Sequence, residues 1–113
     1  MKEIKAIIQP FRLSEVVDAL KAIEGLPGVT VSEVRGFGKG RARHSTKKIV
    51  DDGIDYAMKT KLEVVVPDEM VEEVLRTICV HGKTGHPGDG KIFVSNIDEV
   101  INVRTGQRGK NAI

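Results

Sequence analysis

The sequence predicts an α+β fold in which two helices cover one face of a four-stranded sheet. Strand-like and helix-like apolar segments follow the order β-α-β, a long connection, then β-α-β. The two halves also resemble each other, because Ile7–Pro10 and Val65–Pro67 each place a proline after an apolar strand and before a helix. A doubled β-α-β unit in 113 residues folds most naturally as a ferredoxin-like sandwich, with residues 1–113 forming a single domain.

The first half contains a strand, a helix and a second strand. Ile4–Ile8 is an apolar run that ends before Pro10, which is typical of a buried strand. Apolar residues at helical spacing over Leu13–Ile23 predict an amphipathic helix, and the glycines and proline that follow end it. Alternating valines then predict a half-buried strand over Val29–Gly36.

The second half repeats this order. Leu62–Val66 alternates as a strand, and Asp68 is placed to cap a helix that ends at Gly82. Cys79 lies in that helix, where we expect it to be a small buried residue. Lys91–Ile97 predicts the next strand.

The C-terminal region is expected to add a small strand and a tail. Apolar residues over Val100–Arg104 predict a short extra strand, and 105–113 is a polar tail with an apolar end. Apolar residues fall on both faces of the predicted strands Ile4–Ile8 and Ile92–Val94, whereas two helices cover only one face. We therefore expect a homo-oligomer that covers the second face.

The connection 37–57 has neither helical nor strand periodicity and is long for a domain of this size. It carries a basic run followed by aspartates, which is typical either of a solvated loop or of an arm that docks onto an acidic partner. We favour docking, because long loops in compact domains tend to be functional. The docking candidates are Arg41, Arg43, Lys47 and Lys48.

Composition narrows the class of protein. The formal net charge of +2 is too small to indicate nucleic-acid binding by itself. The one cysteine cannot form an internal disulfide, so we expect a reduced, cytoplasmic compartment. No apolar run approaches the roughly 18 residues that span a bilayer, so direct membrane insertion is not expected.

The segment Thr84–Lys91 is rich in glycine and ends in a lysine at the start of an apolar strand. Glycine has no Cβ, so backbone N–H groups can approach a ligand closely and φ > 0 is allowed. Successive backbone donors followed by an ammonium suit a polyanion, above all the phosphates of a nucleotide. The segment matches neither the Walker A nor the dinucleotide motif, and the alternative interpretation is a tight turn into a hairpin.

No catalytic or metal-binding arrangement is evident. The sequence has no Ser/His/Asp or Cys/His constellation and no carboxylate pair placed for acid–base chemistry. The histidines, at positions 44, 81 and 86, do not have the spacing of metal ligands. We therefore expect a binding protein and not an enzyme, with no protein-bound metal.

Five segments together resemble the PII nitrogen signal-transduction proteins, and a terminal Ala112-Ile113 adds to the match. Each segment alone is weakly diagnostic, but all of them in order and at matching spacing are specific, and they cover the chain nearly end to end. The segments are Met1–Phe11, Val31–Gly38, Glu63–Asp68, Thr84–Val94 and Val103–Gly106.

The resemblance implies a homotrimer with nucleotide sites between neighbouring subunits, where ATP and ADP compete. It also implies that the 37–57 loop docks onto a transporter, an enzyme or a transcription factor in nitrogen regulation. The positions that match the family's nucleotide-binding residues are Thr30, Gly36, Phe37, Gly38, Lys39, Val65, Thr84, Gly88, Asp89, Gly90, Lys91, Asn102, Val103 and Arg104.

Several positions depart from typical members. Gly40 stands where they have a glutamine that helps hold Mg²⁺ and 2-oxoglutarate, although Lys59 matches the lysine that meets 2-oxoglutarate. Asn102 replaces the first arginine of an Arg-x-Arg pair that contacts phosphate. Asp52 aligns with a tyrosine that is uridylylated in many bacterial members, so we do not expect that modification. Binding of Mg²⁺ and 2-oxoglutarate, and discrimination between ATP and ADP, stay open.

Three other functions remain open. One is a PII-like regulator tied to a heavy-metal efflux system. The second is a basic ferredoxin-like module that binds nucleic acid through Lys39–Lys48, which is disfavoured because no aromatic residues interleave with these cations. The third is an adaptor that has lost nucleotide binding, which Asn102 keeps open and the intact glycine loop disfavours.

Overall fold

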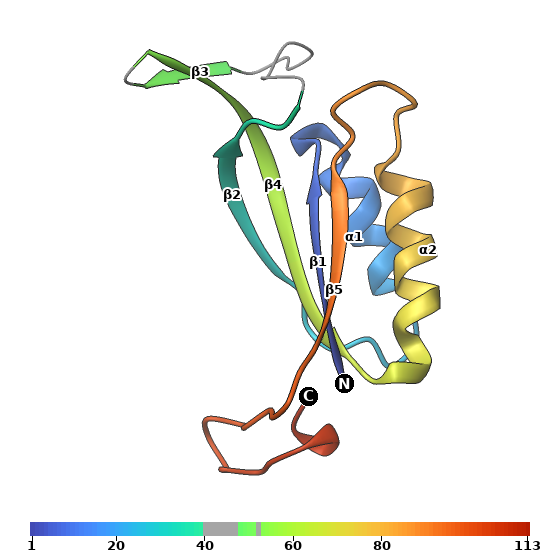
Figure 1. Cartoon of the computed structure of the whole chain (residues 1–113). Helices are drawn as coiled ribbons and strands as arrows, with labels where there is room; N and C mark the ends of the chain where they lie inside the picture. The colour runs from blue at the N-terminus through green and yellow to red at the C-terminus, as the bar shows by residue number, and fades with distance from the viewer. Residues whose placement is uncertain (40–47, 52) are drawn as a thin grey trace.

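The computed structural model describes residues 1–39, 48–51 and 53–113, and it has two layers, a sheet with both α-helices packed on one face (Figure 1). Short 3₁₀ helices precede each α-helix and end the chain. The elements are β1 (Lys2–Ile8), η1 (Pro10–Arg12), α1 (Leu13–Lys21), β2 (Thr30–Gly36), β3 (Lys48–Asp51), β4 (Ile54–Val66), η2 (Asp68–Met70), α2 (Val71–Gly82), β5 (Lys91–Asn96) and η3 (Lys110–Ala112).

The sheet has the order β2-β4-β1-β5, and β3 pairs with the outer part of β4. All these pairs are antiparallel, with Ile4 opposite both Val64 and Val94. Each β-α-β half therefore contributes one central and one edge strand, which confirms the predicted ferredoxin-like α+β fold.

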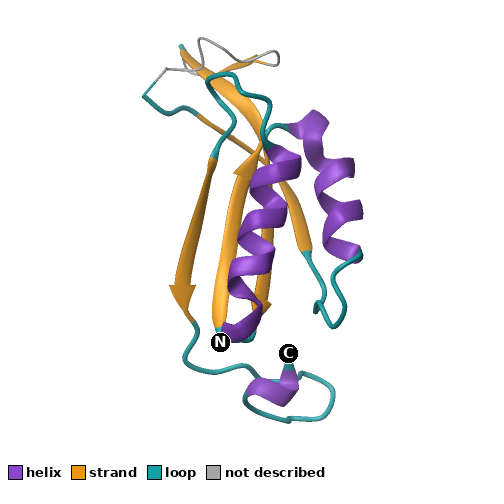
Figure 2. Cartoon of the chain, turned by 90° about the vertical axis from the view of Figure 1, so that its right-hand side faces the viewer, coloured by secondary structure: helices purple, strands orange, loops and turns teal. Residues whose placement is uncertain are grey.

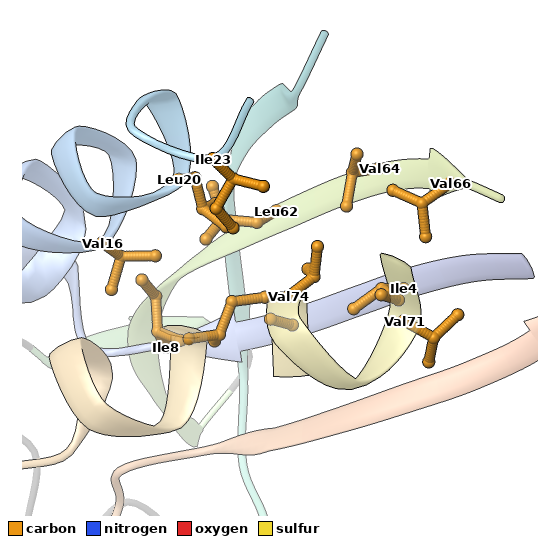
Figure 3. Packing of buried hydrophobic residues seen from close by; sticks show 12 residues of the cluster. Ile4, Ile8, Val16, Leu20, Ile23, Leu62, Val64, Val66, Val71 and Val74 are labelled. Atoms are coloured by element: carbon orange, nitrogen blue, oxygen red, sulfur yellow. The ribbon is translucent and has the colours of Figure 1, made fainter. Parts of the chain in front are cut away.

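Aliphatic side chains from the two helices meet those on one face of the sheet and form the core (Figure 3). Alternation along β1 places Ile4, Ala6 and Ile8 on this face, and helical spacing places Val16 and Leu20 opposite them. Fully burying such an aliphatic side chain stabilises the fold by about 1.5–3 kcal/mol. The buried cluster is Ile4, Ala6, Ile8, Val16, Leu20, Ile23, Leu62, Val64, Val66, Val71, Val74 and Ile78.

Both α-helices lie on the same side of the sheet, and none of the described helices covers the opposite face (Figure 2). The strand register places Phe93 beside Lys5 and Val65 beside Glu3 on this face, so apolar and charged side chains alternate across it. Phe93 is 53% exposed. This face is the one that the sequence predicts to be covered by another copy of the chain.

The structure corrects the prediction of an unstructured connection over 37–57. β3 and the first residues of β4 form a hairpin inside this segment, with Lys48 opposite Ala57 and Asp51 opposite Ile54. Val50 and Ile54 are exposed, and the sequence of this hairpin shows no apolar alternation. The candidates Gly40, Arg41, Arg43 and Lys47, together with Asp52, lie outside the described residues, and Lys48 is described only as part of β3.

Three smaller predictions also need correction. Val100–Arg104 is not a strand. Among the described residues, its β-pairing consists of a single bridge between Ile101 and Arg108. Asp68 does not cap α2, since it lies inside η2 and neither helix start has a side-chain cap. Cys79 is exposed, because Val74 and Ile78 occupy the buried stripe of α2.

Candidate functional site

The glycine loop connects α2 to β5 at one end of the sheet (Figure 1). Gly85, Gly88 and Gly90 all have positive φ, at 88°, 93° and 102°. These are conformations that residues with a Cβ rarely adopt, so the glycines are needed for the path of the backbone. The predicted glycine-dependent loop is therefore present.

The carboxylate of Asp89 holds the loop closed from inside. It accepts a hydrogen bond from the hydroxyl of Thr84, and its Oδ2 accepts the backbone N–H groups of Thr84 at 2.8 Å and Gly85 at 2.9 Å. Burial raises the pKa of Asp89, but the hydrogen bonds from Thr84 and Gly85 and the charge of His86 outweigh it and leave the pKa lowered. Asp89, expected among the nucleotide-binding residues, is therefore engaged within the loop.

Gly90 makes the closest approach between the loop and the sheet. A Cβ built on Gly90 would lie 1.6 Å from the backbone oxygen of Ile7. No side chain fits at this distance, so only glycine allows the chain to enter β5 beside the end of β1. The start of β5, and hence Lys91, is positioned by this contact.

Lys59 reaches the loop from β4. Its ammonium donates to the backbone oxygen of Gly88, and burial lowers its pKa, an effect partly opposed by the charge of Asp89. Gln9 also lies next to Gly88 and is only 8% exposed. Sequence reasoning did not single out Gln9, and its signal is a glutamine that directly follows an apolar strand.

Lys91 is the exposed cation at the end of the loop. It pairs with Ile7 in the sheet and points to the face that has no helix. Its ammonium has no hydrogen-bond or ion-pair partner among the residues that the structure describes. It is therefore available to an anion that enters beside the loop.

The Gly36–Lys39 segment leaves the same end of the sheet. Gly36 pairs with Ala57 in β4, and the ring of Phe37 lies 6.0 Å from that of Tyr56. Arg35 lies over the same Tyr56 ring at 5.3 Å and pairs with Asp51 at 3.1 Å. These contacts join the end of β2 to the β3–β4 hairpin.

The other predicted cation, Arg104, lies in the C-terminal tail. Arg108 pairs with Glu99 at 3.6 Å and Lys110 with Glu69 at 2.7 Å. Arg104 has no such partner among the described residues, and it is exposed. Carboxylates therefore neutralise Arg108 and Lys110, whereas the guanidinium of Arg104 remains available to a ligand.

The strand register separates the two parts of the predicted site. Lys91 pairs with Ile7 near the end of β1, whereas Asn96 pairs with Lys2 at its beginning. β5 thus places the loop and the start of the tail about 17 Å apart. Both views show the tail continuing beyond the sheet, away from the glycine loop (Figures 1 and 2). Within one chain, Arg104 and Lys91 do not form a common site.

The remaining predicted positions fall between these ends. Val65 pairs with Glu3, toward the tail, and Thr30 pairs with Glu63 on the neighbouring strand. Both belong to the face of the sheet without helices. The structure thus groups Thr84–Lys91, Lys59 and Gly36–Lys39 at one end, and it places the tail residues Asn102–Arg104 at the other.

A groove of about 450 Å³ lies on the helix side, between η1 and the strands β2 and β4. None of the predicted nucleotide-binding residues lines it. Its lining residues are Pro10, Phe11, Leu13, Val31, Ser32, Glu33, Met58 and Thr60.

The described ranges 1–39, 48–51 and 53–113 contain neither a membrane-spanning helix nor a metal-binding cluster. No helix there has the length and apolar character needed to cross a membrane. Nor do three or more histidine, cysteine, aspartate or glutamate side chains gather there in a way that would hold a metal ion.

Fold and loop together define a ferredoxin-like chain with an exposed, glycine-dependent loop that ends in a lysine. The family model "Nitrogen regulatory protein P-II" matches residues 1–107. The chain belongs to this family, whose members are signalling proteins and not enzymes.

Relatives from bacteria and archaea match over the full chain. The Nitrogen regulatory protein P-II of Rhizobium meliloti is 47% identical over 113 residues, which is all of both chains. The Nitrogen regulatory protein P-II 2 of Methanothermobacter thermautotrophicus is 50% identical over all of this chain and 97% of its own. That of Bradyrhizobium diazoefficiens is 45% identical over all of both chains.

Proposed function

We propose that this chain is a cytoplasmic, homotrimeric sensor of ATP and ADP that regulates a target protein in nitrogen metabolism. The observation that carries the proposal is the separation of two available cations, Lys91 and Arg104, at opposite ends of one subunit. A polyphosphate that needs both must lie between two copies of the chain. The half-apolar sheet face around Phe93 is the surface on which such copies would meet.

Each part of the site has a distinct role in this proposal. The glycines from Gly88 to Gly90 let backbone N–H groups approach the phosphates, and Lys91 adds a charge-assisted contact. Arg104 of a neighbouring copy contributes a planar fork that can bind two phosphate oxygens. Asp89 keeps the loop in shape for this purpose and does not need to touch the ligand.

Signalling would follow from the position of the Gly36–Lys39 segment beside the loop. The γ-phosphate of ATP adds negative charge near Lys39, and ADP lacks it. A switch of the 37–57 segment from mostly one state to mostly the other needs roughly 5 kcal/mol of difference between the ligands, and a smaller difference gives graded control. Lys59 would receive a dicarboxylate such as 2-oxoglutarate only after leaving the backbone oxygen of Gly88.

Isothermal titration calorimetry of the purified protein with ATP and with ADP tests nucleotide binding. Lys91→Ala and Arg104→Ala should each weaken binding by about 10- to 150-fold, the loss expected for one charge-assisted contact. Lys21→Ala is the matched control, because it removes the same charge from the exposed face of α1. A folded protein that gives no heat with either nucleotide at millimolar concentration would refute the proposal.

Mixed oligomers test whether two chains build one site. Lys91→Ala and Arg104→Ala subunits, co-expressed with different tags and purified through both, form only mixed trimers, in which about one site in three should recover wild-type affinity. Both variants are defective as homo-oligomers. If the mixed oligomers bind no better than either parent, both cations belong to the same chain's site and the two-chain arrangement is wrong.

A further inference from the structure

Asn102 is the centre of the tail turn. Its Oδ1 accepts the backbone N–H groups of Arg104 and Thr105, both at 3.0 Å. Its own backbone N–H donates to the oxygen of Gln107, and its backbone oxygen accepts from Gly106, both at 2.8 Å. One residue therefore closes the segment 102–107 through four hydrogen bonds.

The two bonds to Oδ1 depend on the side chain, and they form the turn that asparagine makes with residues following it in sequence. They fix the backbone of Arg104 at its amide, while the guanidinium has no partner among the described residues. Val103, at the tip of the turn, is fully exposed, so no packing holds the segment in place. The side chain of Asn102 is therefore the main constraint on where Arg104 begins.

The turn is separate from the core of the subunit. No residue of the tail belongs to the buried cluster of β1, β4 and the two helices. The tail is held to itself by the Ile101–Arg108 bridge and to η2 by the pair of Lys110 with Glu69. Loss of the Asn102 side chain should therefore loosen the turn and leave the fold intact.

We propose that Asn102 is a positioning residue for anion binding, whose carboxamide oxygen holds Arg104 ready for the phosphates of a bound nucleotide. This inference rests on the proposed function, in which Arg104 contacts phosphate. A loose turn must be ordered when the ligand binds, and the conformational entropy lost at that moment weakens binding. Asn102 removes this cost by ordering the turn beforehand.

A thermodynamic cycle with ATP and ADP as probes tests the inference. Asn102→Ala should weaken binding by about tenfold, and Asn102→Ser, which keeps an oxygen acceptor, should retain most of the affinity. In the Arg104→Ala background, Asn102→Ala should have no further effect, because Asn102 acts through Arg104. Thermal unfolding of each variant should show a midpoint close to that of the wild type.

The possible results distinguish a failure of the positioning role of Asn102 from a failure of the proposed nucleotide binding. Wild-type protein that binds neither nucleotide overturns both. If the wild-type protein binds nucleotide and the Asn102→Ala variant binds it with the same affinity, only the positioning role is overturned. Additive losses from Asn102→Ala and Arg104→Ala, without rescue by serine, would mean that Asn102 contacts the ligand itself, which also overturns the positioning role.

Discussion

The two segments that flank β5 each contain a turn, and the two turns are held in different ways. The glycine loop before β5 is fixed to the sheet, because Gly90 lies against the backbone of Ile7 and Lys59 bonds to Gly88. The turn after β5 is held by the hydrogen bonds of Asn102 and by the Ile101–Arg108 bridge, and it contributes no residue to the buried core. Both leave one cation available, but only the first is positioned by the fold of the subunit.

This difference separates two ways of preparing a binding group. The glycine loop takes its rigidity from the packed sheet, so changes there should affect folding and binding together. The tail turn takes its shape from local hydrogen bonds, so changes there should affect binding with little effect on stability.

Gly90→Ala should have the largest effect. Its Cβ would collide with the Ile7 oxygen at 1.6 Å, and φ is 102° at this residue, so the start of β5 must move away from β1. We expect a loss of more than about 3 kcal/mol of unfolding free energy, measured by urea denaturation. Gly106→Ala is the control: its φ is also positive, at 73°, but its Cβ meets nothing within 4 Å, so about 1–2 kcal/mol is expected. Equal losses would contradict the distinction between the two ends.

Asp89→Asn should have an intermediate effect. It removes the charge that strengthens the bonds from Thr84 and Gly85, at a cost of about 1–3 kcal/mol in unfolding free energy at pH 7. The pKa of Asp89 is lowered in the folded state. The contribution of its carboxylate to the free energy of unfolding is therefore fully present above the ordinary pKa of 3.8, and it is lost as the pH falls through the lowered pKa. The difference between wild type and variant should stay constant from pH 7 to 5 and shrink below pH 4. Urea denaturation across this range measures it, and a difference that grows on acidification would disprove the role of the carboxylate.

Lys110→Ala should have the smallest effect. It breaks an exposed ion pair with Glu69, and such surface pairs contribute little to stability. We expect an unchanged melting temperature and faster hydrogen exchange confined to the tail. Stability that falls as far as in Asp89→Asn would show that the tail is anchored to the body more firmly than its contacts indicate.

Much of the fold could be predicted because burial leaves a periodic trace in the sequence. β1 and α1 each bury one side of a regular element, and Ile4–Ile8 and Leu13–Ile23 show the corresponding spacing. The β3–β4 hairpin was missed because its apolar residues, among them the exposed Val50 and Ile54, do not follow such a spacing. Val100–Arg104 was wrongly predicted as a strand, because its apolar residues follow a strand pattern but form only the Ile101–Arg108 bridge within the described residues.

The site was predictable in its residue types and less so in its geometry. The glycines and Lys91 were identified because each has a chemical reason to be there. The engagement of Asp89 with Thr84, and of Asn102 with Arg104, could not be distinguished from ligand binding, since the same oxygen atoms serve either purpose. That Lys91 and Arg104 lie at opposite ends became clear only from the strand register.

The central position of β1 has a consequence for how the chain is made. This strand precedes both of its neighbours in the sequence, since its partners are residues 60–66 of β4 and 91–96 of β5. Its apolar residues must therefore wait for residues 60–66 before the first neighbour is in place, and for residues 91–96 before the second. Such long-range pairing slows folding and exposes an apolar strand meanwhile, so the nascent chain should depend on chaperones more than its small size suggests.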